Sequence, residues 1–406
     1  MLRYKSTTNF SGSQNIFVHL PKIAYALMNT LFKLTLVSCS FLLLFGCQPT
    51  VTEKFTPVNP DASPEAKQLL SFLYSIQGKY TLAGQHNFVS DLLRYDDAVM
   101  EIAGKTPVVW GSDFSFNALG GSAKKFQHCG PMNLTVPFTP CDFNGRTTEE
   151  LRQGMINETI RQYNNGRIIT LMWHGCFPTE GDSCNGSAIW AMENRPSPEV
   201  WKELVTNGTE LNLKWKQQAD NIAGYLKQLQ AAKVPVLWRP YHEMNGVWFW
   251  WCNHPGDDGF KKLWIMMYNY FTHHHKLNNL LWVWNTNAPR DIPGDEAFPY
   301  EMFYPGSEYV DILAADIYRQ DYKQSHHDDL LNVGSGKLIA LGEIGQLPTV
   351  EQYDAQKKWA WFMTWGYFVS ENYGNTPQMV QAIYNHPQTL TLDKLDFSER
   401  TYKLKK

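Results

Sequence analysis

Residues 236–251 read VLWRPYHEMNGVWFWW and are the most informative stretch of the sequence. A short apolar run ends in Arg239, continues through His242 and Glu243, and leads into the aromatic residues 248–251. The carboxyl ends of barrel strands carry the site residues of (β/α)8 proteins, and ligand clefts combine a few polar groups with aromatic walls. The stretch therefore predicts a parallel strand whose end opens into a functional cleft.

Similar β-rich runs recur along the chain and alternate with amphipathic stretches, as in repeated βα units around a parallel sheet. Helices are expected at 147–163, 211–232, 259–275 and 351–358. The predicted fold is α/β, a (β/α)8 TIM barrel formed by a single catalytic domain over residues 66–406. We expect eight strands, at residues 80–85, 107–113, 167–173, 234–239, 279–285, 311–318, 337–343 and 359–365.

An open doubly wound sheet is the competing architecture. It usually carries a glycine-rich phosphate turn after its first strand, but residues 82–87 read LAGQHN and contain no GxGxxG. The GSGK at 334–337 lacks the leading Gly and the trailing Ser or Thr of a phosphate loop. The long segments 114–146 and 174–208 fit a barrel better, as loops at the carboxyl-terminal face that shape a cleft.

A second carboxylate follows another apolar run, because residues 338–345 read LIALGEIG and place Glu343 at a strand end. Glu243 and Glu343 would come from the fourth and seventh strands and meet across one barrel mouth. Glycoside hydrolysis needs such a pair, one group to protonate the leaving oxygen and one to meet the developing positive charge. A zinc protease motif is excluded, since HExxH requires histidine where Gly246 stands.

Four segments together resemble glycoside hydrolase family 26: GQH at 84–86, the HE motif with its WFWW tail at 242–251, LWVWN at 281–285, and GEIG. The resemblance covers roughly residues 66–390. It implies a retaining enzyme with Glu243 as acid/base and Glu343 as nucleophile, whose carboxyl groups lie about 5 to 5.5 Å apart. Cys252 departs from the pattern, where a glycine is expected.

The resemblance also implies roles around the pair. Tyr318 would hydrogen-bond the nucleophile, Asp316 would tune the acid/base, and burial should raise the pKa of Glu243. Trp248 and Trp365 would stack on sugar rings, and core packing is the alternative for Trp251. The predicted substrate-binding residues are His174, Arg239, His242, Asn245, Trp248, Trp251, Asp316, Tyr318 and Trp365.

The expected activity is that of a mannan endo-1,4-β-mannosidase acting on mannan, galactomannan or glucomannan. The alternatives are cleavage of mixed-linkage β-glucan or xylan, and a surface lipoprotein that binds glycan without cutting it. The net charge of −3 comes without a long basic stripe, which argues against nucleic acid as a partner. We expect a monomer that needs no cofactor and no metal.

The amino-terminal residues predict export. Residues 28–47 read MNTLFKLTLVSCSFLLLFGC, a signal peptide whose LFGC end resembles a bacterial lipobox. We expect residues 1–46 to be the signal, with Met28 as an alternative start, Cys47 to be lipidated, and residues 47–65 to form a tether. The protein would then sit in the bacterial cell envelope, anchored to the outer membrane through lipid.

Export permits disulfides. The short spacings favour Cys129 with Cys141 and Cys176 with Cys184, which leaves Cys252 free, while Cys176 with Cys252 stays an alternative. A zinc site at His174, Cys176 and Cys184 is disfavoured, because the spacing matches no common zinc motif.

Overall fold

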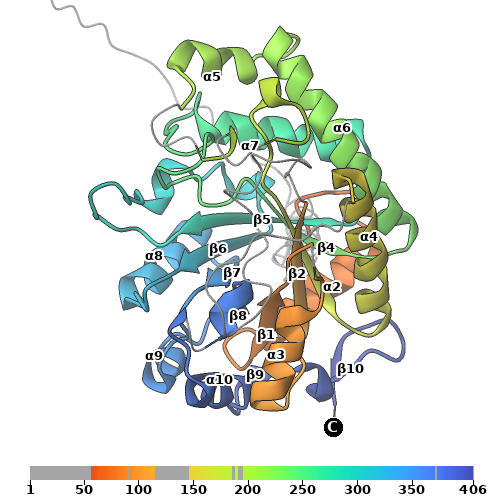
Figure 1. Ribbon diagram of the computed structural model, residues 1–406, viewed down its shortest axis with the longest axis vertical. Coiled ribbons are helices and arrows are strands. Elements are labelled where there is room, and N and C mark those ends of the chain that lie inside the picture. Colours follow the sequence, from red (N-terminus) through yellow and green to blue (C-terminus); the bar gives the residue numbers. More distant parts are fainter. Residues whose placement is uncertain are drawn as a thin grey trace, which may run out of the picture. The chain divides into compact units, whose positions relative to one another are not determined.

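The computed structural model describes residues 56–89, 91–114, 146–184, 188–190, 195–370 and 373–405. Eight parallel strands of that part close into a barrel, because β1 pairs with β8 on one side and with β2 on the other (Figure 1). The predicted (β/α)8 barrel is confirmed. The strands are β1 (Thr81–His86), β2 (Val109–Phe114), β3 (Ile168–Trp173), β4 (Val236–Pro240), β5 (Leu280–Asn287), β6 (Ile312–Ile317), β7 (Leu338–Ile344) and β8 (Trp359–Thr364).

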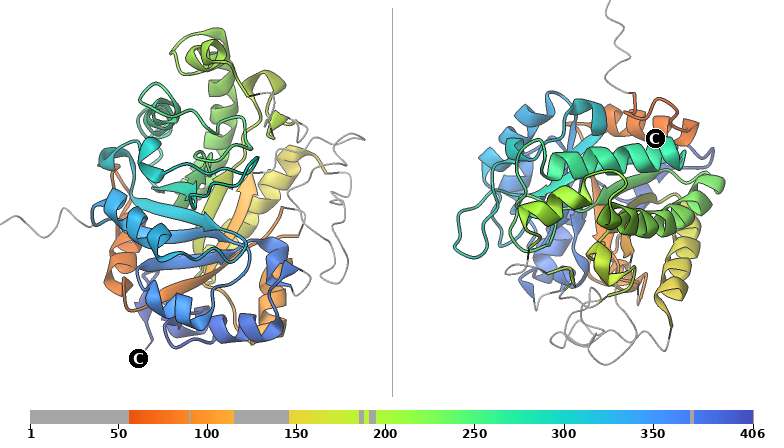
Figure 2. Two further views of the ribbon diagram at one scale, coloured as in Figure 1. Left: turned by 90° about the vertical axis from the view of Figure 1, so that its left-hand side faces the viewer. Right: turned by 90° about the horizontal axis from the view of Figure 1, so that it is seen from above.

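Helices form an outer layer around the strands (Figures 1 and 2). None of the helices in the described part is long and apolar enough to cross a membrane. They are α2 (Pro64–Ile76), α3 (Arg94–Ala103), α4 (Thr148–Asn164), α5 (Pro198–Leu204), α6 (Glu210–Ala231), α7 (Phe260–Asn269), α8 (Gln324–Gly334), α9 (Val350–Ala355) and α10 (Pro377–Tyr384).

Two of the predicted helices end earlier than the sequence suggested. The helix expected at 259–275 is α7 followed by one π-helical turn, Tyr270–His274. The helix expected at 351–358 stops at Ala355, because the chain must extend again for β8 at Trp359. Short strands follow the barrel, namely β9 (Thr389–Leu390) beside β1, and the antiparallel pair β10 (Leu395–Asp396) and β11 (Lys403–Leu404).

The barrel strands are buried along their whole length, as expected for parallel strands covered on both faces. Early strand residues such as Leu237, Leu281 and Ile312 form one apolar cluster with Leu69 and Leu73 of α2. α2 therefore closes the amino-terminal end of the barrel, and the opposite end is left for the site.

The predicted tether at 47–65 extends too far, because residues 56–65 are packed on the barrel. The Val58 N–H donates to Oδ1 of Asp311 at 2.7 Å, and the buried Asn59 amide donates to the carbonyl of Leu277 at 3.0 Å. The Ser63 side chain accepts from the Ala66 N–H and caps α2. The Pro and Ser residues that suggested a tether thus form a turn and a helix start.

Candidate active site

The carboxyl ends of the strands open into a cleft of about 660 Å³. Its wall contains residues that follow several different strands, which is the usual site geometry of this fold. Six residues predicted from the sequence line it: His174, His242, Glu243, Trp248, Tyr318 and Trp365.

Glu243 lies beyond the end of β4 in a backbone conformation that side chains rarely adopt, with φ of 55°. Its N–H donates to the carbonyl of Asn285 at 2.7 Å, which holds the turn in place. Trp248 Nε1 donates to Oε2 of Glu243 at 2.7 Å, and the Asn287 amide donates to Oε1. Both oxygens of this buried carboxyl group are therefore held by neutral donors.

Glu343 lies on β7 and meets a different set of partners. The Tyr318 hydroxyl donates to its Oε2 at 2.7 Å. The Arg239 guanidinium lies 3.7 Å from Oε1, and Nε2 of His242 lies 3.4 Å from the same oxygen. A buried cation and a hydroxyl donor thus favour the ionised form of Glu343.

Gly342 leaves space for the side chains of Asn285 and Asp316 beside Glu343. A Cβ at this position would lie 1.8 Å from Oδ1 of Asn285 and 2.8 Å from Oδ1 of Asp316. Asn285 in turn accepts a hydrogen bond from Arg239 NH1 at 2.6 Å. The glycine before Glu343 is therefore required for close approach of β5, β6 and β7 around the pair.

The carboxyl groups of the site influence one another. Burial raises the pKa of Glu243 and of Glu343, and the charge of Glu243 raises the pKa of Glu343 further. Arg239 and Tyr318 act against this rise at Glu343. Burial, with the charges of Glu343 and Glu243, holds the pKa of Asp316 well above its ordinary value. The cluster therefore holds its protons to a higher pH than free carboxyl groups do, and the Arg239 cation favours the ionised form of Glu343.

His174 follows β3 and is fixed by Asp113 at the end of β2. Its Nδ1 lies 2.8 Å from Oδ2 of Asp113, and its N–H donates to Oδ1 at 3.3 Å. Burial, with the nearby Arg239 charge, lowers the pKa of His174 to about 3. The imidazole is therefore neutral at the cleft wall, oriented by a carboxylate behind it.

Comparisons with known proteins place the chain. The model of glycosyl hydrolase family 26 matches residues 58–122 and 144–394, which is most of the chain. The chain belongs to this family. The structure of GH26A from Muricauda sp. is 42% identical, with a TM-score of 0.73, over 84% of this chain and 100% of that one.

Other relatives of this family 26 chain carry names that state an activity. The GH26-CBM35 β-(1,4)-mannanase of Podospora anserina is 30% identical with a TM-score of 0.64, over 84% of this chain and 68% of that one. A mannan endo-1,4-β-mannosidase of Thermothelomyces thermophilus is 30% identical over 83% of this chain. The chain spans 62% of that relative's length and 52% of mannan endo-1,4-β-mannosidase A from Piromyces sp..

Four predicted substrate-binding residues of the family 26 chain do not line the cleft. The Asn245 side chain is fully buried and binds the backbone of Asn287 and Phe298. Trp251 is fully buried, stacks on Phe249 at 4.4 Å between ring centroids, and donates to the His242 carbonyl. These two buried side chains pack behind the cleft wall and do not line the cleft. The other two, buried as well, are Arg239 and Asp316.

Several cleft residues were missed by the sequence analysis. Asn287 could have been found, because strand alternation places it on the same face as Asn285 of the LWVWN motif. Phe249 belongs to the aromatic run 248–251 but was not singled out as a binding residue, and the others come from segments without strand periodicity, where no local signal marked them. The missed residues include Phe88, Trp190, Phe249, Asn287, Arg290 and Gln346.

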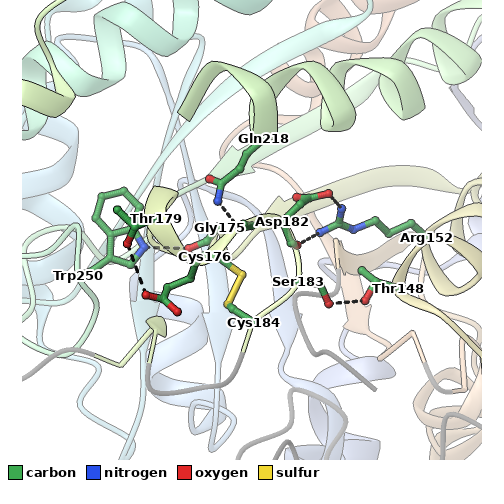
Figure 3. Close-up of a disulfide and its surroundings, with 12 residues drawn as sticks. Thr148, Arg152, Gly175, Cys176, Thr179, Asp182, Ser183, Cys184, Gln218 and Trp250 are labelled. Atoms are coloured by element: carbon green, nitrogen blue, oxygen red, sulfur yellow. Dashed lines mark hydrogen bonds and ion pairs between the residues drawn. A yellow bond between two sulfur atoms is a disulfide. The ribbon is translucent and has the colours of Figure 1, made fainter. Parts of the chain in front are cut away.

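A disulfide joins Cys176 and Cys184 in the segment after β3, the pairing that the sequence favoured (Figure 3). Beside it, Asp182 forms an ion pair with Arg152 of α4, and Trp250 Nε1 donates to the Gly175 carbonyl at 2.8 Å (Figure 3). These contacts fix the loop near the cleft to a helix of the outer layer.

The remaining cysteine predictions divide in two. Cys252 is a free, buried thiol whose Sγ donates to the Glu243 carbonyl at 3.1 Å, and burial raises its pKa. The alternative bond between Cys176 and Cys252 is thereby excluded. Cys47, Cys129 and Cys141 lie outside the described residues.

Three side chains of the site are of types that can bind a metal ion. Ligand atoms of His242, Glu243 and Asp316 lie within 4.8 Å of one another. The raised pKa values of Glu243 and Asp316 mean that a cation would have to displace protons here. The absence of a metal requirement stays a prediction.

Proposed function

We propose that the protein is a retaining glycoside hydrolase, a mannan endo-1,4-β-mannosidase, with Glu243 as acid/base and Glu343 as nucleophile. One observation carries the proposal: Glu243, just after β4, lines the cleft, and Glu343 on β7 contacts the cleft residues Tyr318 and His242, so two buried glutamates with different partners serve one site. Environments that push two carboxyl groups toward different protonation states are how such enzymes separate acid from nucleophile.

In the first step the Glu343 carboxylate would attack the anomeric carbon while the bond to the leaving sugar oxygen breaks. Glu243 would give its proton to that oxygen, which leaves a glycosyl ester on Glu343. Tyr318 and Arg239 support the ionised nucleophile before attack. The hydrogen bonds from Asn287 and Trp248 orient the acid.

In the second step Glu243, now a carboxylate, would take a proton from water. The water oxygen would attack the same carbon, and the Glu343 carboxylate would leave. Two inversions give net retention. Esterification removes the negative charge of Glu343, and the pKa of Glu243 should fall accordingly, which suits its change from acid to base.

The substrate proposed is β-1,4-mannan, including galactomannan and glucomannan. The names of the relatives support this choice, and so does a β-mannanase from a termite symbiotic protist, 27% identical, solved with gluco-manno-oligosaccharide. The aromatic wall formed by Trp248, Trp365 and Phe249 suits stacking on sugar rings.

The experiment compares reducing-sugar release from mannan, mixed-linkage β-glucan and xylan by the wild type and Glu343→Ala. The proposal is supported if the wild type releases sugar from mannan and not from the other two polysaccharides, and if Glu343→Ala releases none. Release chiefly from glucan or xylan would assign a different substrate, and binding without release from any of them would favour the glycan-binding alternative.

The location is proposed on the sequence alone: lipidation at Cys47, with the barrel domain held at the bacterial outer membrane. The lipobox-like LFGC at 44–47 supports this proposal. The substrate, a polymer, would be met outside the cytoplasm.

A further inference from the structure

Arg290 lies just after β5, at the base of a hairpin that borders the cleft. Its backbone pairs with Ala297 in both directions at 2.9 Å, and this pairing closes the segment between them. Its Nε and NH2 donate to the two carboxyl oxygens of Asp295 at 3.0 and 2.7 Å, and Nε also donates to the Asp295 carbonyl at 2.8 Å. The guanidinium is therefore held in one orientation by its own loop.

This guanidinium contacts both residues that hold Glu243. Its NH1 donates to Oδ1 of Asn287, which turns the amide NH2 of Asn287 toward Oε1 of Glu243. The same group lies 4.9 Å from the centroid of the Trp248 ring, and Trp248 Nε1 donates to Oε2. An asparagine amide can present either oxygen or nitrogen, so a donor on Oδ1 decides which end faces the carboxyl group.

The charge of Arg290 also acts on the acid. It lowers the pKa of Glu243, and the charge of Asp295 raises it. Several ionisable groups face Glu243, from β6 and β7, from the segment after β4 and from the hairpin after β5. They are His242, Asp316, Tyr318, Glu343, Cys252, Arg290 and Asp295. Loss of the Arg290 charge should therefore raise the pKa of Glu243.

We propose that Arg290 is a positioning residue that holds both donors to the Glu243 carboxyl group in place. The proposal rests on the proposed function, in which Glu243 is the acid/base. Arg319 offers a matched comparison, because its guanidinium also donates to Asp295 but is 61% exposed and contacts neither Asn287 nor Trp248.

The test measures kcat and KM across pH for the wild type, Arg290→Met, Arg290→Lys and Arg319→Met. The substrates are mannan and a dinitrophenyl β-mannobioside, whose leaving group needs no proton. For Arg290→Met we expect kcat on mannan to fall about tenfold to a hundredfold, as for loss of a charged hydrogen bond. On the dinitrophenyl substrate we expect a much smaller loss.

The pH profile separates this role from a merely structural one. Arg290→Met should move the basic limb of kcat/KM on mannan to higher pH, because the pKa of Glu243 rises when the cation is lost. Arg290→Lys keeps the charge and should leave that limb in place with intermediate kcat. Arg319→Met should leave it in place as well. Equal losses on both substrates with an unmoved limb would overturn the proposal.

A titration without turnover distinguishes failure of this inference from failure of the proposed function. Carboxyl bands in infrared difference spectra of the wild type, Glu243→Gln and Arg290→Met identify Glu243 and its pKa directly. A rise in that pKa in Arg290→Met supports the inference even if no substrate is cleaved. An unchanged pKa, with unchanged kinetics, refutes it.

Discussion

Tyr318 and Glu343 are joined by a hydrogen bond of 2.7 Å from the phenol oxygen to Oε2, between the neighbouring strand ends of β6 and β7. Burial and the surrounding carboxylates hold the pKa of Tyr318 well above its ordinary value. The phenol therefore stays a donor over the whole working pH range. A variant at this position tests how much the ionised nucleophile depends on that proton.

Tyr318→Phe should lower kcat on mannan by roughly tenfold to a hundredfold, because a hydrogen bond to a charged group contributes about 1.5 to 3 kcal/mol. Steady-state kinetics measure this. Tyr322→Phe is the control, since that hydroxyl donates to the backbone carbonyl of Gln346 and not to a carboxylate. Equal losses in the two variants would refute a specific role for Tyr318.

The same variant should change the acidic limb of the pH profile. The Tyr318 hydrogen bond lowers the pKa of Glu343, so its loss raises that pKa. Activity needs ionised Glu343, and activity should therefore be lost at a higher pH as the solution is acidified. Profiles of kcat/KM for wild type and variant give the limb, and a shift to lower pH would contradict the assignment.

Glu243→Ala and Glu343→Ala should differ in their dependence on the leaving group. Glu243→Ala should keep much of the first-step rate on a dinitrophenyl β-mannobioside and lose activity on mannan, since acid catalysis is dispensable only for the activated bond. Glu343→Ala should lose activity on both substrates. Burst kinetics detect the first step. Equal losses on both substrates for Glu243→Ala would refute the assignment of Glu243 as the acid/base.

Gly342→Ala should destabilise the fold, because the added Cβ would overlap Oδ1 of Asn285. Overpacking of this kind costs about 1 to 3 kcal/mol or more. Gly224→Ala on α6 is the matched control, with nothing within 4 Å of its Cβ, and should be neutral or stabilising. Thermal unfolding of the two variants checks this, and similar melting temperatures would contradict the crowding argument.

Cys47→Ser should abolish lipidation and release the barrel domain from the membrane fraction. Expression of the full chain in a bacterium fed labelled fatty acid, followed by fractionation, measures both effects. Cys39→Ser, within the expected signal, is the control and should keep the label. Unlabelled wild-type protein would rule out the lipid anchor.

Much of the fold could be predicted from the sequence, because barrel strands are short apolar runs with turns between them. Each of the eight expected strands overlaps an observed one. The boundary at residue 66 was wrong because Val58 and Asn59 are fixed by Asp311 and Leu277, contacts far away in the sequence. Local composition could not reveal them.

Some residues of the site could also be predicted from the sequence, and others could not. Glu243 and Glu343 were visible as single carboxylates at strand ends. Asn245 and Trp251 belong to the same motif, but their side chains bind the backbone behind the cleft wall. Residue type alone does not tell a residue that lines the cleft from one that packs behind it. Arg290 lies in a polar loop where arginine is common, and only the folded hairpin brings it to Asn287 and Trp248.

The positive φ at Glu243 has a consequence for protein engineering. Side chains with a Cβ are disfavoured there by about 1 to 2 kcal/mol, whereas glycine is not. A library screened for heat resistance alone would therefore favour glycine at this turn and discard the acid. Any search for a more durable form of this protein has to select for turnover at the same time.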